Sequence, residues 1–383
     1  MILIKNGYIK TMAGEDIENG CILIGDDGKI AEIGKDINVC SDVQIIDAEG
    51  RLVTPGCIDG HCHIGLDNEL TGLANQDHNE RIDPITPQMR AIDSINPIDT
   101  PFEEAIMNGV TAACTGPGSA NVVGGTFAAI KLVGKNVDKM VIKHPIAMKC
   151  AFGENPKKVY GQGKGKSPYS RMGIAYLLRE LLTKAKKYSD EDAAGKEHNI
   201  DLKLEAMIPV MRKEIPLKAH AHQADDILTA IRIAKEFDVN LTIDHCTDGA
   251  VIADELKEAG YPVCFGPTLG SRGKYELRNK HFDTAAKLND AGIEMCIITD
   301  SPVIPICYLP LCAALAVKHG LDKEAAWRAI TVNPAKIAGI FDRVGSLEVG
   351  KDADVVIWTD DPMTAVAARS FVTVVDGKVV YSM

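Results

Sequence analysis

The segment Pro55-Gly56-Cys57-Ile58-Asp59-Gly60-His61-Cys62-His63 carries two histidines that could bind one metal ion. Its Pro-Gly pair predicts a turn that leads into a short β-strand. Because successive side chains of a strand point to opposite faces, His61 and His63 share one face. Imidazole is a ligand for zinc, iron, copper and nickel, so both rings can reach the same ion. A motif this short also occurs as two ordinary histidines near a turn. Other elements must therefore supply further ligands.

Three more segments end an apolar run with a side chain that can bind a metal. They are Lys218-Ala219-His220-Ala221-His222, Ile243-Asp244-His245-Cys246 and Ile297-Ile298-Thr299-Asp300. A single histidine of this kind is more often a buried, hydrogen-bonded residue than a ligand. Several such strand ends on one barrel would meet at the rim where barrels place their catalytic groups. Together with the first pair, they predict a metal site.

The elements that would position these residues alternate between strands and helices. Apolar runs of strand length lie at 58–63, 110–115, 127–133, 146–152, 217–222, 241–245, 262–265 and 295–299. Apolar residues at helical spacing lie at 173–187, 224–237, 250–259 and 324–330. This alternation predicts an α/β fold, a (β/α)8 TIM barrel of parallel strands. The polar segments 64–100 and 153–171 would be loops after the first and fourth strands, either substrate walls or solvated loop tips.

Both ends of the chain are rich in short strands and tight turns. Gly25-Asp26-Asp27-Gly28 separates two Ile-rich runs, and Asp376-Gly377 separates two Val-rich runs, which indicates a hairpin at each end. We expect residues 1–54 and 343–383 to form one small β-sandwich domain and residues 55–342 to form the barrel. Two separate β caps would produce the same pattern.

Composition argues against several classes of partner. The 383 residues carry a net charge of −11, which disfavours nucleic acid and anionic membranes as partners. We find no apolar run long enough to span a bilayer, and the first residues do not fit a secretory leader. Eleven cysteines without C-x-x-C pairs are typical of reduced thiols in a cytoplasmic protein. The oligomeric state stays open, a homo-oligomer included.

In combination, these motifs resemble the amidohydrolase superfamily, nearest to its imidazolonepropionase-like and prolidase-like branches. The resemblance covers nearly the whole chain, including Gly345-Ser346-Leu347-Glu348-Val349-Gly350, which is similar to the segment that returns from barrel to sandwich. It implies that His61 and His63 hold one metal ion together with Asp300. His220 and His245 would hold a second ion or complete the first site. The implied cofactor is Zn²⁺, as one or two divalent ions, and the implied substrate is a small-molecule amide.

The chemistry that the resemblance implies is hydrolysis of a C–N bond in an amide or a cyclic amide. A zinc-class ion lowers the pKa of bound water from ~15.7 to about 7, and it polarises the substrate carbonyl. Asp300 would be the general acid and base, taking a proton during hydroxide attack and delivering it to the leaving nitrogen. His222 shares a strand face with His220. It could bind substrate or oxyanion, or be a buried structural histidine.

A second metal ion would need a bridging ligand, and the fourth strand offers two candidates. Lys149 lies where prolidase-like members carry a carboxylated lysine, and a lysine in an apolar strand is costly unless it is paired. A salt-bridged barrel lysine is the alternative. Glu154 follows the strand and could bind metal or substrate. After the seventh strand, Arg272 could bind a substrate carboxylate in a bidentate way, or be an ordinary surface arginine.

Two other functions compete with amide hydrolysis. Members that deaminate rings resemble each other in carrying a glutamate three residues after the fifth-strand histidine. This chain has Gln223 there, which cannot relay a proton, so an aminohydrolase (deaminase) of a nitrogen heterocycle is disfavoured. A catalytically silent scaffold of the same fold would be expected to have lost a ligand. All five candidates are present, namely His61, His63, His220, His245 and Asp300.

Overall fold

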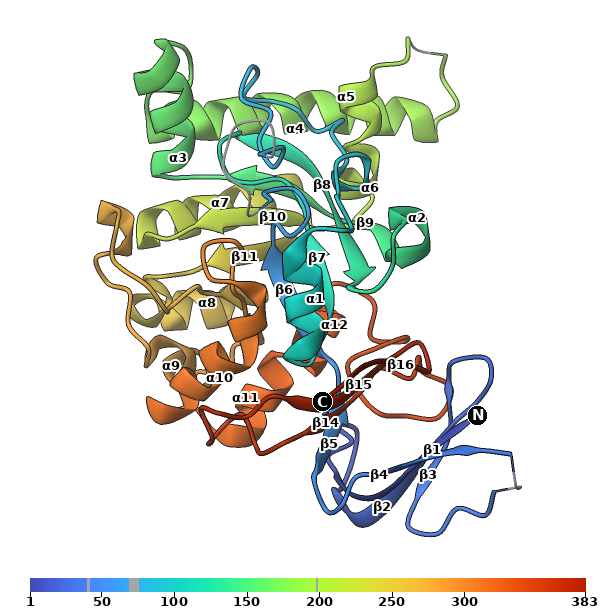
Figure 1. Cartoon of the computed structure of the whole chain (residues 1–383). Helices are drawn as coiled ribbons and strands as arrows, with labels where there is room; N and C mark the ends of the chain where they lie inside the picture. Colours follow the sequence, from blue (N-terminus) through green and yellow to red (C-terminus); the bar gives the residue numbers. More distant parts are fainter. Residues whose placement is uncertain (40–41, 69–75, 198) are drawn as a thin grey trace.

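Two eight-stranded sheets organise the chain (Figure 1). The computed structural model describes residues 1–39, 42–68, 76–197 and 199–383. One sheet is surrounded by helices, and the other is built from both ends of the chain and lies beside it, at the bottom of Figure 1. The helices are α1 (Thr100–Met107), α2 (Val137–Met140), α3 (Glu154–Pro156), α4 (Arg171–Ala193), α5 (Leu202–Glu205), α6 (Ile208–Met211), α7 (Ala224–Phe237), α8 (Ala253–Ala259), α9 (Thr284–Asp290), α10 (Leu309–Lys318), α11 (Lys323–Ala329) and α12 (Val332–Ile337).

The central sheet curls into a barrel. Its strands are β6 (Cys57–Cys62), β7 (Val110–Thr115), β8 (Val123–Lys131), β9 (Val141–Ala151), β10 (Leu217–Ala221), β11 (Leu241–His245), β12 (Val263–Phe265) and β13 (Met295–Ile297), in that spatial order. The edge strands β6 and β13 meet at their carboxyl ends. There the Asp300 N–H donates to the His61 carbonyl over 3.2 Å, and the His63 N–H donates to the Ser301 carbonyl over 2.8 Å. The barrel fold class is confirmed.

The third barrel strand departs from the predicted parallel arrangement. β8 runs antiparallel to both β7 and β9, whereas the other neighbouring pairs are parallel. A parallel crossover needs about a dozen residues or more. Only residues 116–122 connect β7 to β8, and only residues 132–140 connect β8 to β9. The connections are therefore too short for parallel pairing, and the expectation of eight parallel strands is wrong at this strand.

The second sheet joins the two ends of the chain. It contains β1 (Ile2–Ile9), β2 (Ile17–Ile24), β3 (Ile30–Gly34), β4 (Gln44–Asp47), β5 (Leu52–Pro55), β14 (Val355–Trp358), β15 (Ser370–Val375) and β16 (Lys378–Ser382). β14 pairs with β5, which links the C-terminal strands to the N-terminal ones. Ile4, Ile22, Val355 and Val374 are among the buried residues of a core separate from that of the barrel. One sheet from both termini is thus present, and the domain limits at 54/55 and 342/343 stay a prediction.

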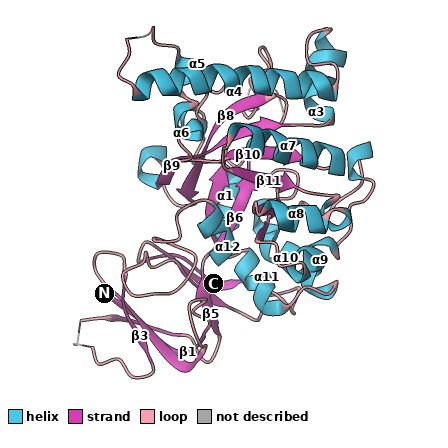
Figure 2. Cartoon of the chain, turned by 180° about the vertical axis from the view of Figure 1, so that it is seen from behind, coloured by secondary structure: helices cyan, strands magenta, loops and turns pink. Residues whose placement is uncertain are grey.

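The helices cover the outside of the barrel, as the view from behind shows (Figure 2). α7 matches its predicted limits, and it buries Ile227, Ala230, Ile231 and Ala234 at the spacing of one helix face. In the described part of the chain, we find no helix with the length and apolar character needed to cross a membrane. The helices thus serve to pack against the strands that carry the site.

Candidate metal centre

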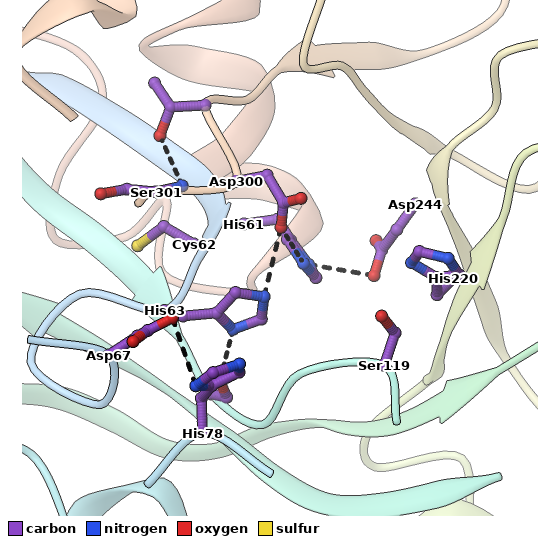
Figure 3. A network of polar contacts seen from close by, with 12 residues as sticks. His61, Cys62, His63, Asp67, His78, Ser119, His220, Asp244, Asp300 and Ser301 are labelled. Atoms are coloured by element: carbon purple, nitrogen blue, oxygen red, sulfur yellow. Dashed lines mark hydrogen bonds and ion pairs between the residues drawn. The ribbon is translucent and has the colours of Figure 1, made fainter. Parts of the chain in front are cut away.

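β6 brings His61 and His63 to the carboxyl end of the barrel, and both rings approach one carboxylate (Figure 3). Their Nε2 atoms lie 3.4 and 3.2 Å, respectively, from the same atom, Oδ1 of Asp300. His61 is fully buried, and His63 is nearly so. The alternation of strand side chains therefore places two imidazoles and one carboxylate at a single point.

Strained backbone accompanies two of the site residues. Asp300 and His245 have φ angles of 55° and 73°, in the left-handed region that residues other than glycine rarely adopt. Such strain is concentrated at functional sites. Buried Asp59 supports this region, because it accepts hydrogen bonds from the N–H groups of His61 and Thr299 over 3.1 and 3.3 Å. Burial raises the pKa of Asp59 to about 7. These bonds connect β6 to the residue that precedes Asp300.

His220, His222 and His245 form a second group of possible ligands. One nitrogen from each of the three rings lies within 4.8 Å of the other two. A nitrogen of His61, a nitrogen of His245 and a carboxylate oxygen of Asp300 lie equally close to one another. His245 belongs to both groups, so the two are contiguous. β10 contributes His220 and β11 ends at His245, as the sequence predicts. The structure thus brings five of the six predicted metal ligands, His61, His63, His220, His245 and Asp300, into one cluster that also contains His222.

Three of the rings turn Nδ1 toward an oxygen, which leaves the Nε2 lone pair facing the cluster. Nδ1 of His63 lies 2.7 Å from the Gly116 carbonyl, and Nδ1 of His245 lies 2.8 Å from the Gly266 carbonyl. Nδ1 of His61 lies 3.0 Å from Oδ2 of Asp244. Since these oxygens only accept, each Nδ1 carries the proton and each Nε2 presents a lone pair. Nε2 of His245 is buried and has no hydrogen-bond partner among the described residues.

The charge states suit a cation as well. Burial lowers the pKa of His220, His222 and His245 well below the ordinary value, so their rings are neutral at pH 7. Burial would raise the pKa of Asp300, but the neighbouring histidines outweigh that effect and the net direction is strongly downward. Neutral imidazoles and an ionised carboxylate are the donors that zinc-class ions prefer. The residues present therefore fit a divalent metal ion.

Asp244, Lys149 and Lys218 form a buried charged group beneath the histidines. Lys149 and Lys218 are paired in register on β9 and β10. Their Nζ atoms lie 3.2 Å from Oδ2 and 2.9 Å from Oδ1 of Asp244, respectively. Lys149 Nζ also lies 3.3 Å from Nε2 of His61, and burial lowers its pKa. Sequence reasoning missed Asp244 and Lys218, although both belong to strand ends that carry the predicted histidines.

Neither of the two predicted substrate-binding residues lines the cavity of about 940 Å³ in front of the cluster. Arg272 is exposed and donates a hydrogen bond of 2.7 Å to the Lys280 carbonyl. It lines a side cavity of about 320 Å³ and not the main one. Glu154 begins α3, where its Oε1 accepts a hydrogen bond of 3.1 Å from the Glu276 N–H. Each of the two side chains thus bonds to the backbone of another residue, and its role in substrate binding stays a prediction.

Glu276 is a buried carboxylate that sequence reasoning missed. It is 1% exposed, and its Oε1 lies 3.8 and 3.7 Å from Nε2 of His220 and His222, respectively. Its Oε2 accepts a hydrogen bond of 3.0 Å from the Glu154 N–H. Glu276 belongs to a single helical turn, Tyr275–Leu277, after β12. Because this turn lies in a polar loop, no periodic pattern marks Glu276 as buried.

A cavity of about 940 Å³ opens in front of the cluster. His63, His220, His222 and Asp300 line it, and its walls are formed by segments after β6, β9 and β12, of which the segment after β9 is helical over residues 154–162. This volume is within the range of small-molecule sites. The site is therefore that of a barrel enzyme with polar, metal-competent side chains at the carboxyl ends of its strands.

Comparison with known proteins identifies the family. A sequence profile described as "Amidohydrolase family" matches residues 52–380, and the chain belongs to this family. It is 31% identical over 362 residues to the amidohydrolase tasK of Hapsidospora irregularis, a match that covers 86% of this chain and 36% of that protein. This chain thus corresponds to about a third of that relative. It is 24% identical over 401 residues to an imidazolonepropionase of Symbiobacterium thermophilum, covering 93% and 90% of the two chains.

Solved structures agree with this placement. The crystal structure of an amidohydrolase from Thermotoga maritima MSB8 is 41% identical, with a TM-score of 0.96 and full coverage of both chains. A Xaa-Pro dipeptidase with bound methionine has a TM-score of 0.62 at 17% identity, which shows the fold alone. The protein is accordingly a hydrolase that acts on carbon–nitrogen bonds.

Proposed function

We propose that this hydrolase uses a divalent metal ion to cleave a C–N bond in a small-molecule amide or cyclic amide. The His245 ring carries the proposal, because its Nε2 is buried in the cluster without a hydrogen-bond partner among the described residues. A buried acceptor left without a partner is costly. A cation in front of that atom would satisfy it, and the surrounding imidazoles and carboxylate suit zinc.

The residues that would hold the ion are His61, His63, His220, His245 and Asp300. A bound zinc-class ion supplies a water molecule of lowered pKa and polarises the substrate carbonyl. Asp300 would act as the base that removes the water proton and then as the acid that donates it to the leaving nitrogen. The low pKa of Asp300 supports the first role, because the carboxylate starts in its basic form.

His222 would contact the substrate. Its ring lines the main cavity, and its Nδ1 lies 2.8 Å from the Thr247 hydroxyl, which holds the ring in place. A fixed imidazole beside the carbonyl could donate a hydrogen bond to the developing oxyanion. His222 is also near enough to His220 and His245 to bind the ion, and metal affinity of a His222→Asn variant would separate these two roles.

Lys149 is the better candidate for bridging a second ion. Its Nζ lies 3.3 Å from Nε2 of His61, whereas the Glu154 carboxylate hydrogen-bonds to the Glu276 backbone. Carboxylation would also replace one of two adjacent ammonium groups with an anion, which relieves the repulsion from Lys218. In a two-ion centre, Lys149→Met should lower bound metal from about two equivalents to about one.

The deaminase alternative has less support. Gln223 does not line the main cavity, and its side-chain carbonyl accepts a hydrogen bond of 3.0 Å from Arg278. It is therefore held outside the position from which a proton relay would act. Release of ammonia from purine, pyrimidine or guanidine-type compounds would revive this function.

Metal analysis followed by a substrate panel tests the proposal. Protein purified without chelators should contain at least about one equivalent of a transition metal and should hydrolyse a member of a panel of N-acyl amino acids, dipeptides, hydantoins and lactams. Chelation should abolish turnover, and added Zn²⁺ should restore it. Less than about 0.2 equivalents of metal, with no rescue by zinc or manganese, would contradict the proposal.

The compartment is part of the same proposal. The buried cysteines of the described segments are free thiols, which supports a reducing compartment such as the cytoplasm. We expect the features that select among small-molecule amides to lie in the walls of the main cavity.

A further inference from the structure

The main cavity has a basic rim, although the whole chain carries a net charge of −11. The cationic residues that line it are Arg81, Lys158, Lys164, Lys274 and Lys280. Among the described residues, the acids that line it are Asp67 and Asp300, and Asp300 belongs to the candidate metal centre. The mouth of the cavity is thus positive in a negatively charged protein. Such a field attracts anions and repels cations.

Most of these cations keep their charge available. Lys280 donates hydrogen bonds of 2.9 Å to the carbonyls of Gly270 and Ser271, and Lys164 donates to the Arg81 carbonyl. Backbone carbonyls hold an ammonium group in place without neutralising it. Within the described part of the chain, Lys274 is the rim cation that has a carboxylate within ion-pair distance. The other rim cations, which have no such acid among the described residues, converge on the cavity in an arrangement that suits an anionic ligand.

Lys274 is linked to the histidines through two residues, Asn155 and Glu276. Its Nζ donates a hydrogen bond of 2.9 Å to Oδ1 of Asn155 and lies 3.4 Å from Oε1 of Glu276. Nδ2 of Asn155 in turn lies 3.5 Å from Nε2 of His220. The Lys274 side chain is still 38% exposed, so the ammonium group can bind a ligand in the cavity. Asn155 of α3 and Glu276 therefore hold this cation, and Asn155 separates it from His220 of the candidate metal centre.

We propose that the amide substrate carries a carboxylate group close to the scissile bond and that Lys274 binds this carboxylate, while the other rim cations attract the anion. This inference rests on the proposed function for the identity of the reacting bond. It replaces Arg272 as the residue expected to recognise a carboxylate, because Arg272 lines the side cavity.

Matched substrates provide the first test. Each carboxylate-bearing member of the amide panel is compared with a counterpart in which a hydroxymethyl group replaces the carboxylate. For the metal-loaded protein, we expect kcat/KM to favour the carboxylate by about 100-fold, and Lys274→Met to remove about 10-fold or more of that preference. Lys274→Arg should keep most of it. Equal kcat/KM for the two members, or an equal loss for both in Lys274→Met, would overturn the inference.

Lys257→Met is the matched control. Lys257 is an exposed lysine on α8, and its ammonium group also bonds a backbone carbonyl, that of Gly292, over 3.0 Å. It does not line the main cavity. This variant removes the same charge from the protein but not from the rim, so the preference for carboxylates should be unchanged. A loss equal to that of Lys274→Met would reduce the effect to net charge and overturn the assignment of Lys274.

Binding to metal-free protein separates this inference from the proposed function. Calorimetric titration with a carboxylate member should show binding that weakens as salt rises and that falls about 10-fold in Lys274→Met, whereas its hydroxymethyl counterpart binds weakly in both. Such binding without turnover by the metal-loaded protein would refute the proposed function alone. Turnover without any preference for the carboxylate would refute this inference alone. Equal binding of the two members would also refute it.

Discussion

Two buried lysines of the same barrel have opposite surroundings. Lys131 ends β8, close to the terminal sheet, and Lys149 lies on β9, beneath the histidine cluster. Lys131 is 3% exposed and Lys149 is 0% exposed, so both would be costly without partners. The two lysines differ in the number of acids within ion-pair distance. They differ also in that the site above Lys149 contains Nε2 of His245, which has no partner among the described residues.

Lys131 is surrounded by acids. Its Nζ lies 2.7 Å from Asp354, 3.2 Å from Asp352 and 3.0 Å from Asp376. Burial opposes the charge, yet these carboxylates raise the pKa of Lys131 overall. Because Lys131 ends a barrel strand and its partners flank strands of the terminal sheet, the cluster joins the two sheets. It is a structural cluster in which the cation is fully compensated.

Among the described residues, one acid lies within ion-pair distance of Lys149, and a second lysine shares it. Asp244 contacts both Lys149 and Lys218, and burial lowers the pKa of Lys149. Above this group, Nε2 of His245 has no partner among the described residues. A compensated buried charge contributes to stability, whereas a buried group left without a partner marks a place where a ligand or a modification belongs.

The largest effect is expected at Asp300. Asp300→Asn should retain metal, because the imidazole ligands remain, but kcat should fall by about 10²- to 10⁴-fold through loss of the general base. Elemental analysis and steady-state kinetics measure the two quantities. Asp290→Asn, at the exposed end of α9, is the control and should match the wild type. Near-normal kcat in Asp300→Asn would show that another group moves the proton.

Removing the compensated cation should affect stability and not chemistry. Lys131→Met leaves buried carboxylates without their counter-ion, so the free energy of unfolding should fall by about 3–5 kcal/mol. Denaturant unfolding measures this change, and kcat of the folded fraction should stay close to the wild-type value. An unchanged unfolding free energy would contradict the assignment of Lys131 as a structural counter-ion.

Replacing His245, whose Nε2 has no partner among the described residues, should affect the metal and not stability. His245→Gln should weaken metal binding by at least about 10- to 100-fold, measured by competition with a chelator. The apo protein should unfold at nearly the same denaturant concentration as the wild-type apo protein. His319→Gln is the control, because His319 stacks on Phe282 outside the cluster. Unaltered metal affinity in His245→Gln would place the ion elsewhere.

The smallest effect is expected at Glu154. Glu154→Gln should change kcat/KM by less than about threefold, because the amide oxygen can still accept the hydrogen bond from the Glu276 N–H. Lys149→Gln should give a much larger loss if Lys149 bridges two ions. A large loss in Glu154→Gln together with a small one in Lys149→Gln would reverse the choice between these two candidates.

Much of the fold could be predicted from local patterns. The limits of β7, β11 and α7 agree with the prediction, because apolar runs and helical periodicity report directly on burial. The direction of β8 could not be predicted in this way. Apolar content is the same for a parallel and an antiparallel buried strand, and only the length of the connections separates the two.

The sequence by itself determined which side chains lie at strand ends. Alternation and strand termination place His61, His63, His220, His245 and Asp300 on the barrel rim, whatever the loops do. Only the tertiary structure decided the partners of these residues. Asp244, Glu276 and Lys274 reach the site through pairings and loop conformations that bring distant segments together. Such contacts depend on how the barrel closes, and no local period of the chain records them.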